Sequence, residues 1–226
     1  MNMSIAINTI SRLWKKNGVG FLSHSGSLPK FSIFHFPFSI VTILMLMISM
    51  GTNAQNVNQL FKEGKALYEA KNYAQAFPKL KVAAEKGHKK AQYRLGRCYE
   101  KGRGVAKDEA LAFQWYTKSA AKDYPKGQYA LGMCYKDGIG TAKDPKKAAE
   151  YFSKAAQGDN ADAQYQLGKC YMKGKGITAD QKKAASWFKK AIANEKGGKD
   201  ILAKIRKKAS EGDDNAKAIL KLAGVK

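Results

Sequence analysis

The strongest constraint on this chain is a stretch of sequence that returns with a period of 36 residues. Copies that begin at Ala91, Gly127 and Ala163 carry glycine, cysteine and aromatic residues in the same order. Their first fourteen residues read AQYRLGRCYEKGRG, GQYALGMCYKDGIG and AQYQLGKCYMKGKG. A fixed period of this length is typical of one supersecondary unit that stacks on copies of itself. We therefore expect a repeat array, an architecture that usually acts by presenting a surface.

The first part of each unit predicts a helix of about 13 residues. In the copy that begins at Ala91, the side chains of Leu95, Cys98 and Tyr99 fall on one stripe of such a helix. We expect the helix to end at a glycine in the left-handed conformation. These glycines are Gly102, Gly138 and Gly174, and a second glycine follows two residues after each of them.

A glycine also lies inside each of these helices. The three positions are Gly96, Gly132 and Gly168. Glycine within a helix costs roughly 1 kcal/mol relative to alanine, so a glycine that recurs there needs a structural reason. We expect a neighbouring helix to cross at this point with its backbone too close for a methyl group.

The second part of each unit predicts another helix, which begins after an aspartate that acts as N-cap. In one copy Pro145 takes the first helical position, which suits a residue without an N–H group. Each helix then carries small residues and an adjacent aromatic pair, which we expect to fill the core between units. The caps are Asp108, Asp144 and Asp180, and the pairs are Trp115 with Tyr116, Tyr151 with Phe152, and Trp187 with Phe188.

The string A-x-Y-x-L-G-x-x-Y-x-x-G-x-G, followed by D-x-x-x-A and an aromatic pair, strongly resembles the Sel-one-like repeat, a relative of the tetratricopeptide repeat. The resemblance implies an all-α fold, a right-handed superhelical solenoid of antiparallel helix pairs whose first helices line the concave side. It also implies a non-enzymatic adaptor that holds other proteins. A divergent, tetratricopeptide-like copy precedes the three clear ones, and two short helical segments, Asp200–Lys208 and Asn215–Leu222, follow them as a cap. The expected organisation is a leader at 1–54, the divergent repeat at 55–90, Sel-one-like repeats at 91–126, 127–162 and 163–198, and the helical cap at 199–226.

The leader differs in composition from the rest of the chain. Residues 1–54 contain four Lys and Arg and no Asp or Glu, and an apolar run at 31–50 precedes small residues that end at Ala54. This order is typical of a secretory signal, with Ala54 as the last residue removed. An uncleaved single-pass membrane anchor is the alternative. Both interpretations predict that the repeats lie outside the cytosol, in a periplasmic, secreted or other extracytoplasmic location.

The chain after the leader is strongly basic. It has 37 Lys and Arg against 18 Asp and Glu, a formal charge of +19, and 33 of the cations are Lys. Such a field favours acidic partners, and an anionic cell-envelope polymer or lipid surface is the alternative partner. Lysine also suits solvated helix faces that keep an array soluble, and this is the interpretation we favour. Nucleic acid is disfavoured, because export removes its usual source and the aromatic residues are assigned to the core.

Three cysteines occupy the same position in successive units: Cys98, Cys134 and Cys170. Equivalent positions in stacked helix pairs should lie beyond the ~7 Å between Cα atoms that a disulfide can span. We therefore predict three buried free thiols. A cysteine-rich branch of the family that the chain resembles has two cysteines per repeat and members linked to β-lactam binding and hydrolysis, whereas this chain has one per repeat.

The remaining motifs give little support to catalysis. S-x-x-K occurs at Ser119–Lys122 and Ser186–Lys189, which keeps a β-lactam-interacting hydrolase as a remote alternative, but no S-D-N or K-T-G string completes such a site. His88 is the single histidine after the leader and is expected to be a solvated turn residue. We predict no catalytic, cofactor-binding or metal-ligating residue.

Positions of the first helix that differ between copies are the candidates for partner contacts, because stacking requires the shared positions. The leading hypothesis is therefore an exported scaffold that binds a protein or peptide on the concave face. The candidate residues are Arg94, Ala130 and Gln166, then Arg97, Met133 and Lys169, then Glu100, Lys136 and Met172.

Overall fold

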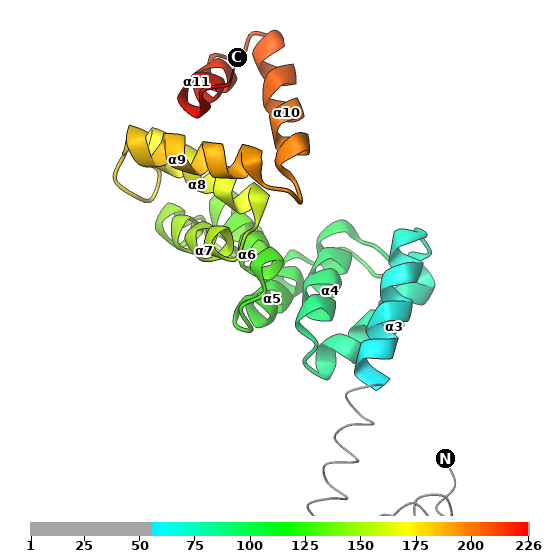
Figure 1. The fold of residues 1–226 in the computed structure, drawn as a ribbon. Helices are drawn as coiled ribbons and strands as arrows, with labels where there is room; N and C mark the ends of the chain where they lie inside the picture. Colours follow the sequence, from blue (N-terminus) through cyan, green and yellow to red (C-terminus); the bar gives the residue numbers. More distant parts are fainter. Residues whose placement is uncertain (1–55, 226) are drawn as a thin grey trace, which may run out of the picture. The chain divides into compact units, whose positions relative to one another are not determined.

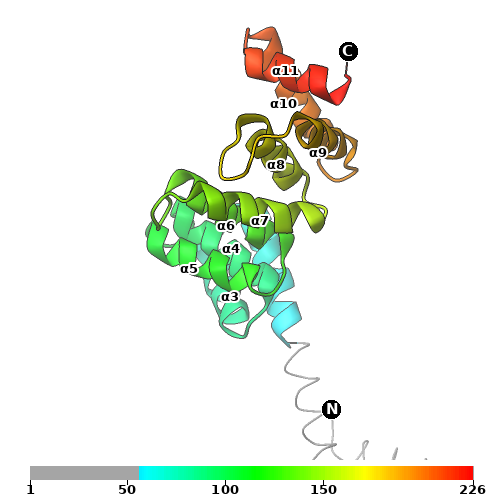
Figure 2. The same ribbon diagram turned by 90° about the vertical axis from the view of Figure 1, so that its left-hand side faces the viewer.

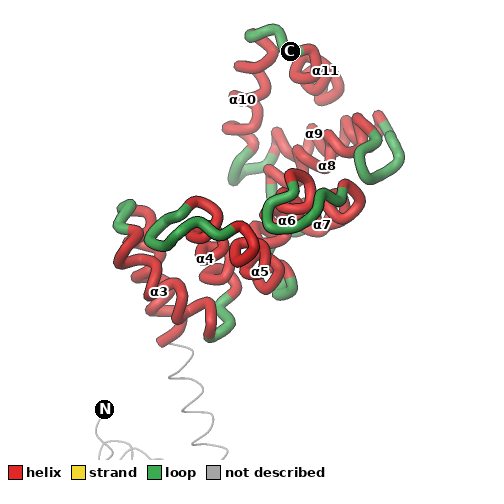
Figure 3. Tube along the Cα trace, turned by 180° about the vertical axis from the view of Figure 1, so that it is seen from behind, coloured by secondary structure: helices red, strands yellow, loops and turns green. Residues whose placement is uncertain are grey.

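A computed structural model describes residues 56–225, and this part of the chain consists of helices and short loops with no strand (Figures 1 and 3). The expected all-α solenoid of stacked helix pairs is thereby confirmed. Helical residues 56–69 come first and are followed by α3 (Tyr73–Glu85), α4 (Lys89–Lys101), α5 (Glu109–Ala120), α6 (Pro125–Asp137), α7 (Pro145–Gln157), α8 (Ala161–Lys173), α9 (Gln181–Ala193), α10 (Gly198–Ser210) and α11 (Asp214–Ala223).

The signal or anchor expected at 1–54 lies outside the described residues. Within residues 56–225, no helix combines the length and the apolar character that crossing a bilayer requires.

Consecutive helices pack together, and the pairs α4/α5, α6/α7 and α8/α9 succeed one another along the array (Figure 1). Direct packing between neighbouring first helices also occurs, with α4 against α6 and α8 against α10. Because the first helix of each pair comes from the same part of the 36-residue unit, α4, α6 and α8 present equivalent positions of the repeat.

Glycine and aspartate set the ends of these helices. Helices α4, α6 and α8 each begin two residues before the copies at Ala91, Gly127 and Ala163, and each has the expected 13 residues. Their closing glycines are left-handed; Gly102, for example, has φ of 65° and donates its amide to the carbonyl of Cys98. In the second helices the expected aspartate caps are present. The carboxylate of Asp108 accepts from the amide of Leu111 at 2.8 Å, Asp144 from Lys147 at 3.0 Å and Asp180 from Lys183 at 2.9 Å.

The reason given for the glycine inside each first helix was wrong. A Cβ atom on Gly96 would lie 2.6 Å from the ring of Tyr116, and one on Gly168 would lie 2.6 Å from the ring of Phe188. The absence of a methyl group therefore makes room for an aromatic ring of the second helix in the same unit. A methyl group on Gly96 or Gly168 would meet this ring before any backbone atom of the second helix.

Close approach of two backbones occurs instead at the second glycine of each G-x-G. At Gly104, with φ of 73°, a Cβ atom would collide with the backbone carbonyl group of Tyr73, the first residue of α3. Gly140 meets the carbonyl of Glu109 in the same way, and Gly176 meets that of Pro145. This glycine lets the loop of one unit lie against the start of the preceding second helix.

The two members of each aromatic pair contribute to the core between units to different degrees. Tyr116, Phe152 and Phe188 are buried, whereas Trp115 and Trp187 remain partly exposed. A lysine side chain lies over each tryptophan ring, at 4.1 Å from the centroid for Trp115. The expectation that both aromatic residues fill the core therefore holds fully for the second member of each pair. The first member is half-buried and packs against a core cluster.

The C-terminal end of the described array is covered by α10 and α11, which lie beside α9 (Figure 2). Ile201 and Ile205 of α10 and Ile219 of α11 share a buried cluster with Phe188 of α9. The helices α10 and α11 extend one or two residues beyond each end of the predicted segments Asp200–Lys208 and Asn215–Leu222.

Candidate functional site

All nine candidate contact residues lie on α4, α6 and α8, and we call the surface that these three helices form the first-helix face. Seven of the nine line two grooves on this face. Arg97, Glu100, Ala130 and Met133 line the groove between α4 and α6, which we call the mixed groove. Lys136, Gln166 and Lys169 line the groove between α6/α7 and α8, which we call the lysine groove.

The mixed groove has a volume of about 440 Å³ and aromatic walls. Tyr93 of α4 and Tyr129 of α6 lie on it together with the edge of Tyr116. The hydroxyl of Tyr116 donates a hydrogen bond to Glu100 at 2.6 Å, and Glu100 also pairs with Lys101 at 2.7 Å. Two cations, two carboxylates and a methionine therefore share this groove with three phenols.

Protonation in the mixed groove is set by these contacts. Burial acts to raise the pKa of Glu100, but the hydrogen bonds from Lys101 and Tyr116 outweigh it and hold that pKa below its ordinary value. Burial, and then the carboxylate of Glu100, raise the pKa of Tyr116. Burial also raises the pKa of Tyr129 to about 12. At neutral pH the groove thus presents an ionised carboxylate and neutral phenols.

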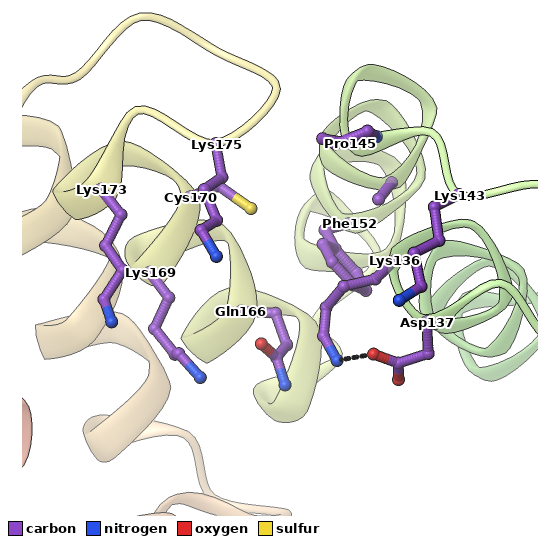
Figure 4. Close-up of a pocket in the computed structure, with 11 residues that line it drawn as sticks. Lys136, Asp137, Lys143, Pro145, Phe152, Gln166, Lys169, Cys170, Lys173 and Lys175 are labelled. Atoms are coloured by element: carbon purple, nitrogen blue, oxygen red, sulfur yellow. Dashed lines mark hydrogen bonds and ion pairs between the residues drawn. The ribbon is translucent and has the colours of Figure 1, made fainter.

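The lysine groove has a volume of about 430 Å³ and is dominated by cations. Its apolar residues are Pro145, which is exposed, and Ala148, Phe152 and Cys170, which are buried. Figure 4 shows α8 as one wall and α6 with α7 as the other. The charged residues on it are Lys136, Lys143, Lys169, Lys173 and Lys175, against the single carboxylate of Asp137.

Most of this positive charge has no partner. Lys136 pairs with Asp137 at 2.5 Å. Within residues 56–225, no carboxylate lies within ion-pair distance of Lys143, Lys169, Lys173 or Lys175. Lys169 is half-buried, and its ammonium lies 5.6 Å from the centroid of the Tyr165 ring. Burial, followed by the like charges of Lys136, Lys173 and Lys208, lowers the pKa of Lys169.

Two of the nine candidates line neither groove. Arg94 pairs with Glu69 at 2.9 Å, and its guanidinium lies 5.3 Å from the centroid of the buried Tyr68 ring. Arg103 donates to the Tyr68 hydroxyl at 2.5 Å, so two arginines hold the helix pair before α4 in place. Met172 packs against the buried cluster at the C-terminal end.

Sequence reasoning missed some of the groove residues. Every copy has a tyrosine at the position of Tyr93 and Tyr129, and this ring packs against the second helix of its unit: the Tyr93 ring lies 6.0 Å from that of Tyr116. The same rings also line the mixed groove, so a residue shared by all copies can both stack and face a ligand. Lys143 and Lys175 lie in the loops that join the two helices of their units, outside the first-helix positions compared between copies.

The cysteines are buried free thiols, as expected. Burial raises the pKa of Cys98 to about 11 and that of Cys134 to about 12. Cys170 is the most exposed of the three at 9%, and it borders the lysine groove. Burial raises its pKa as well, although the neighbouring lysines oppose that shift. These thiols fill the core and are poorly suited to act as nucleophiles.

The S-x-x-K string at Ser119 has a structural role. Ser119 is fully buried, and its hydroxyl donates to the carbonyl of Lys89 at 2.8 Å. The ammonium of Lys122 donates to the carbonyl of Gly87 at 2.6 Å. Serine and lysine thus tie the end of α5 to the start of α4, and neither is arranged to activate the other.

His88 is not the solvated turn residue that the sequence suggested. Its Nδ1 atom accepts from the amide of Ala91 at 3.1 Å and caps α4, and its ring stacks on Phe61 at 4.2 Å between centroids. Among the described residues, no group of three or more His, Cys, Asp or Glu is arranged to hold a metal ion.

The fold and this face define the class of protein: a helical-repeat solenoid with a grooved surface built from successive first helices. The sequence profile of the Sel1 repeat matches residues 89–124, 125–160 and 161–195. Residues 89–195 are therefore three Sel1 repeats, and each match begins at the first residue of α4, α6 or α8.

Solved structures of the same kind resemble the chain. The crystal structure of a Sel1 repeat protein from Oxalobacter formigenes is 33% identical with a TM-score of 0.58, over 61% of this chain and 56% of that one. A protective antigen of uropathogenic Escherichia coli with an SLR fold is 27% identical with a TM-score of 0.61, over 79% of this chain and 43% of that one. This chain thus spans about half the length of each. Among curated proteins, none matches the sequence significantly.

Proposed function

We propose that the protein is a non-enzymatic scaffold that binds a segment of a partner protein along its first-helix face. Sel1 repeats generally mediate protein–protein interaction, which supports a binding role. The observation that carries the proposal is the succession of two grooves formed by α4, α6 and α8, lined by seven of the nine first-helix residues that vary between copies.

An extended peptide fits the dimensions of this face. Packed helices lie ~10 Å apart, and an extended chain advances ~3.3 Å per residue, so a bound segment would pass about three residues per repeat. Asp137 borders both grooves, so that they adjoin at α6. One groove is aromatic and mixed in charge and the other is cationic, and this difference would fix the direction and register of the segment.

A peptide selection with matched variants tests the scaffold function. The protein is used to select binders from a displayed library of random twelve-residue peptides. Ala130→Arg fills the mixed groove with a bulky cation, and Ala110→Arg makes the same change on the exposed side of α5. We expect Ala130→Arg to weaken the selected peptides by at least about tenfold, and Ala110→Arg to leave them unchanged.

Two results would contradict the scaffold function. One is a selection that enriches no sequence. The other is a set of peptides that bind Ala130→Arg as well as they bind the unmodified protein, since such peptides do not use the grooves.

We further propose that the scaffold works outside the cytosol, in a periplasmic, secreted or membrane-anchored form. The support is the acid-free, apolar leader at 1–54. Fractionation of cells that express a C-terminally tagged chain, followed by N-terminal sequencing, distinguishes the forms. A cleaved signal gives a soluble product that starts at Gln55, an anchor gives an intact membrane-bound chain, and an intact cytosolic chain would refute export.

Attachment to an anionic envelope polymer or lipid surface is the second candidate function, favoured by the formal charge of +19 after residue 54. Binding of this kind would weaken steeply with salt and would accept many polymers. Retention on envelope polysaccharide or on anionic vesicles at 1 M salt would exclude a purely electrostatic attachment.

A further inference from the structure

The lysine groove gathers uncompensated positive charge in a recess. Five ammonium groups surround it, and the one carboxylate there is already paired with Lys136. Lys169 is half-buried with no acidic partner, a costly arrangement for a structural lysine. Because its position in the repeat holds Arg97 and Met133 in the other units, stacking does not require this cation. Its charge therefore points to a ligand.

The shape and the lining of the groove narrow the chemistry of that ligand. Pro145 is exposed on the α7 side of the groove, and the lysine side chains have apolar stems, so the groove accepts a ligand that carries apolar groups beside its negative charges. The recess lies between helices α6 and α8 (Figure 4), which suits a narrow chain and does not suit a flat membrane surface. An extended peptide with alternating acidic and apolar side chains has this character.

The cations of the groove are all lysines, which act as point charges on a carboxylate or a phosphate alike, so inorganic phosphate is a competitor in the test below. Nucleic acid fits less well. Phe152 is fully buried, so its ring has no free face on which a nucleic-acid base could stack.

We propose that the lysine groove binds an acidic segment of the partner protein, with Lys169 and Lys173 pairing with its Asp or Glu carboxylates and Pro145 of α7 contacting an adjacent apolar side chain. This inference rests on the proposed scaffold function and names the chemistry of the partner at one of its two grooves. The segment would pass through the groove in extended form, with acidic and apolar side chains on opposite sides of its backbone.

The test uses two eight-residue peptides with blocked ends and a fluorescent label, one alternating Asp with Leu and the other alternating Asn with Leu. Binding to the protein is measured by fluorescence anisotropy. Lys169→Gln with Lys173→Gln removes two groove cations, and the control pair Lys126→Gln with Lys182→Gln removes two exposed cations that have no ion pair. Both double variants therefore carry the same net charge.

We expect the Asp peptide to bind at least about tenfold more tightly than the Asn peptide, and the groove variant, but not the control variant, to lose most of this preference. The groove variant should fold normally, because it removes a half-buried cation that faces like charges. Thermal unfolding checks this. Bound Asp peptide should also slow alkylation of Cys170, which borders the groove, and leave the rate at Cys134 unchanged.

Each other outcome overturns the inference. Equal binding of the two peptides refutes recognition of carboxylates. Equal losses in the groove and control variants show attraction to the overall charge and no site in the groove. If inorganic phosphate or phosphatidylglycerol vesicles bind more tightly than the Asp peptide, and this binding depends on Lys169 and Lys173, the groove recognises a different anion. In all these cases peptides that depend on Ala130 would still support the scaffold function, so the two failures are distinguishable.

Discussion

The two glycines of one G-x-G loop provide a direct test of how the units are joined. Gly102 and Gly104 are both exposed and both left-handed, with φ of 65° and 73°. They differ in what a methyl group would meet. A Cβ atom on Gly102 would have its nearest neighbour at 3.6 Å, an ordinary contact, whereas one on Gly104 would collide with the carbonyl of Tyr73 and lie 2.7 Å from its carbon atom.

The expected free energies of unfolding follow from this difference. Gly102→Ala adds the cost of an L-residue in the left-handed region, about 1–2 kcal/mol. Gly104→Ala adds the same cost and also forces the loop away from the backbone at the start of α3, and strain of that kind costs about 1–3 kcal/mol. Gly104→Ala should therefore be less stable than Gly102→Ala by at least about 1 kcal/mol. In a folded unit of this size, each 1 kcal/mol of lost stability lowers Tm by about 2–4 °C.

Urea unfolding followed by circular dichroism compares the two variants, and hydrogen exchange locates the effect. In Gly104→Ala the amides of α3 should lose protection before those of α7, because the contact with α3 is the one disturbed. Equal destabilisation by the two substitutions would refute the reasoning, since it would mean that Gly104 serves only its backbone conformation.

Three further predictions concern single side chains. Burial lowers the pKa of His88 from 6.5, and the like charges of neighbouring lysines lower it further. The neutral ring caps α4, so this contribution to stability should be full above about pH 6.5 and should be lost as the pH falls through the lowered value. His88→Asn, which keeps a capping oxygen without titrating, should flatten this part of the stability curve. Tyr116→Phe should cost about 1–2 kcal/mol in urea unfolding at pH 7 by removing its hydrogen bond to ionised Glu100, and should cost less once that carboxylate is protonated; an unchanged cost at pH 3 would contradict the assignment. In the folded protein at pH 8, iodoacetamide should modify Cys170 before Cys98 and Cys134, and all three thiols should react after unfolding; faster reaction of Cys98 or Cys134 than of Cys170 would contradict the order of burial.

The ends of the helices could be predicted from the sequence because local chemistry determines them. The cap at Asp144 and the left-handed turn at Gly138 depend on hydrogen bonds and backbone angles within a few residues. The period itself then fixed which helices would stack. Predictions that needed a distance between units were less successful, and the backbone approach assigned to Gly96 belongs to Gly104.

The candidate site was predicted only in part, for a related physical reason. Differences between copies identified Lys169 and Met133, since positions free of stacking can vary. The repeat pattern could not distinguish Arg94 from Arg97. Arg94 pairs with Glu69 and lies over the Tyr68 ring, whereas Arg97 lines the mixed groove. That distinction depends on the divergent helices before α4, which lie outside the 36-residue pattern.

The two grooves also differ for a reason that joins the core to the surface. In the first unit the buried aromatic residue is Tyr116, and its hydroxyl needs an acceptor, which Glu100 supplies at the rim of the mixed groove. In the second unit the equivalent core residue is Phe152, which has no hydroxyl, and the position of Glu100 is taken by Lys136. A carboxylate at that position would have no phenol to satisfy, so the position is free to carry a cation. The loss of one buried hydroxyl thereby permits the charge reversal that turns a mixed groove into a lysine groove one repeat further along.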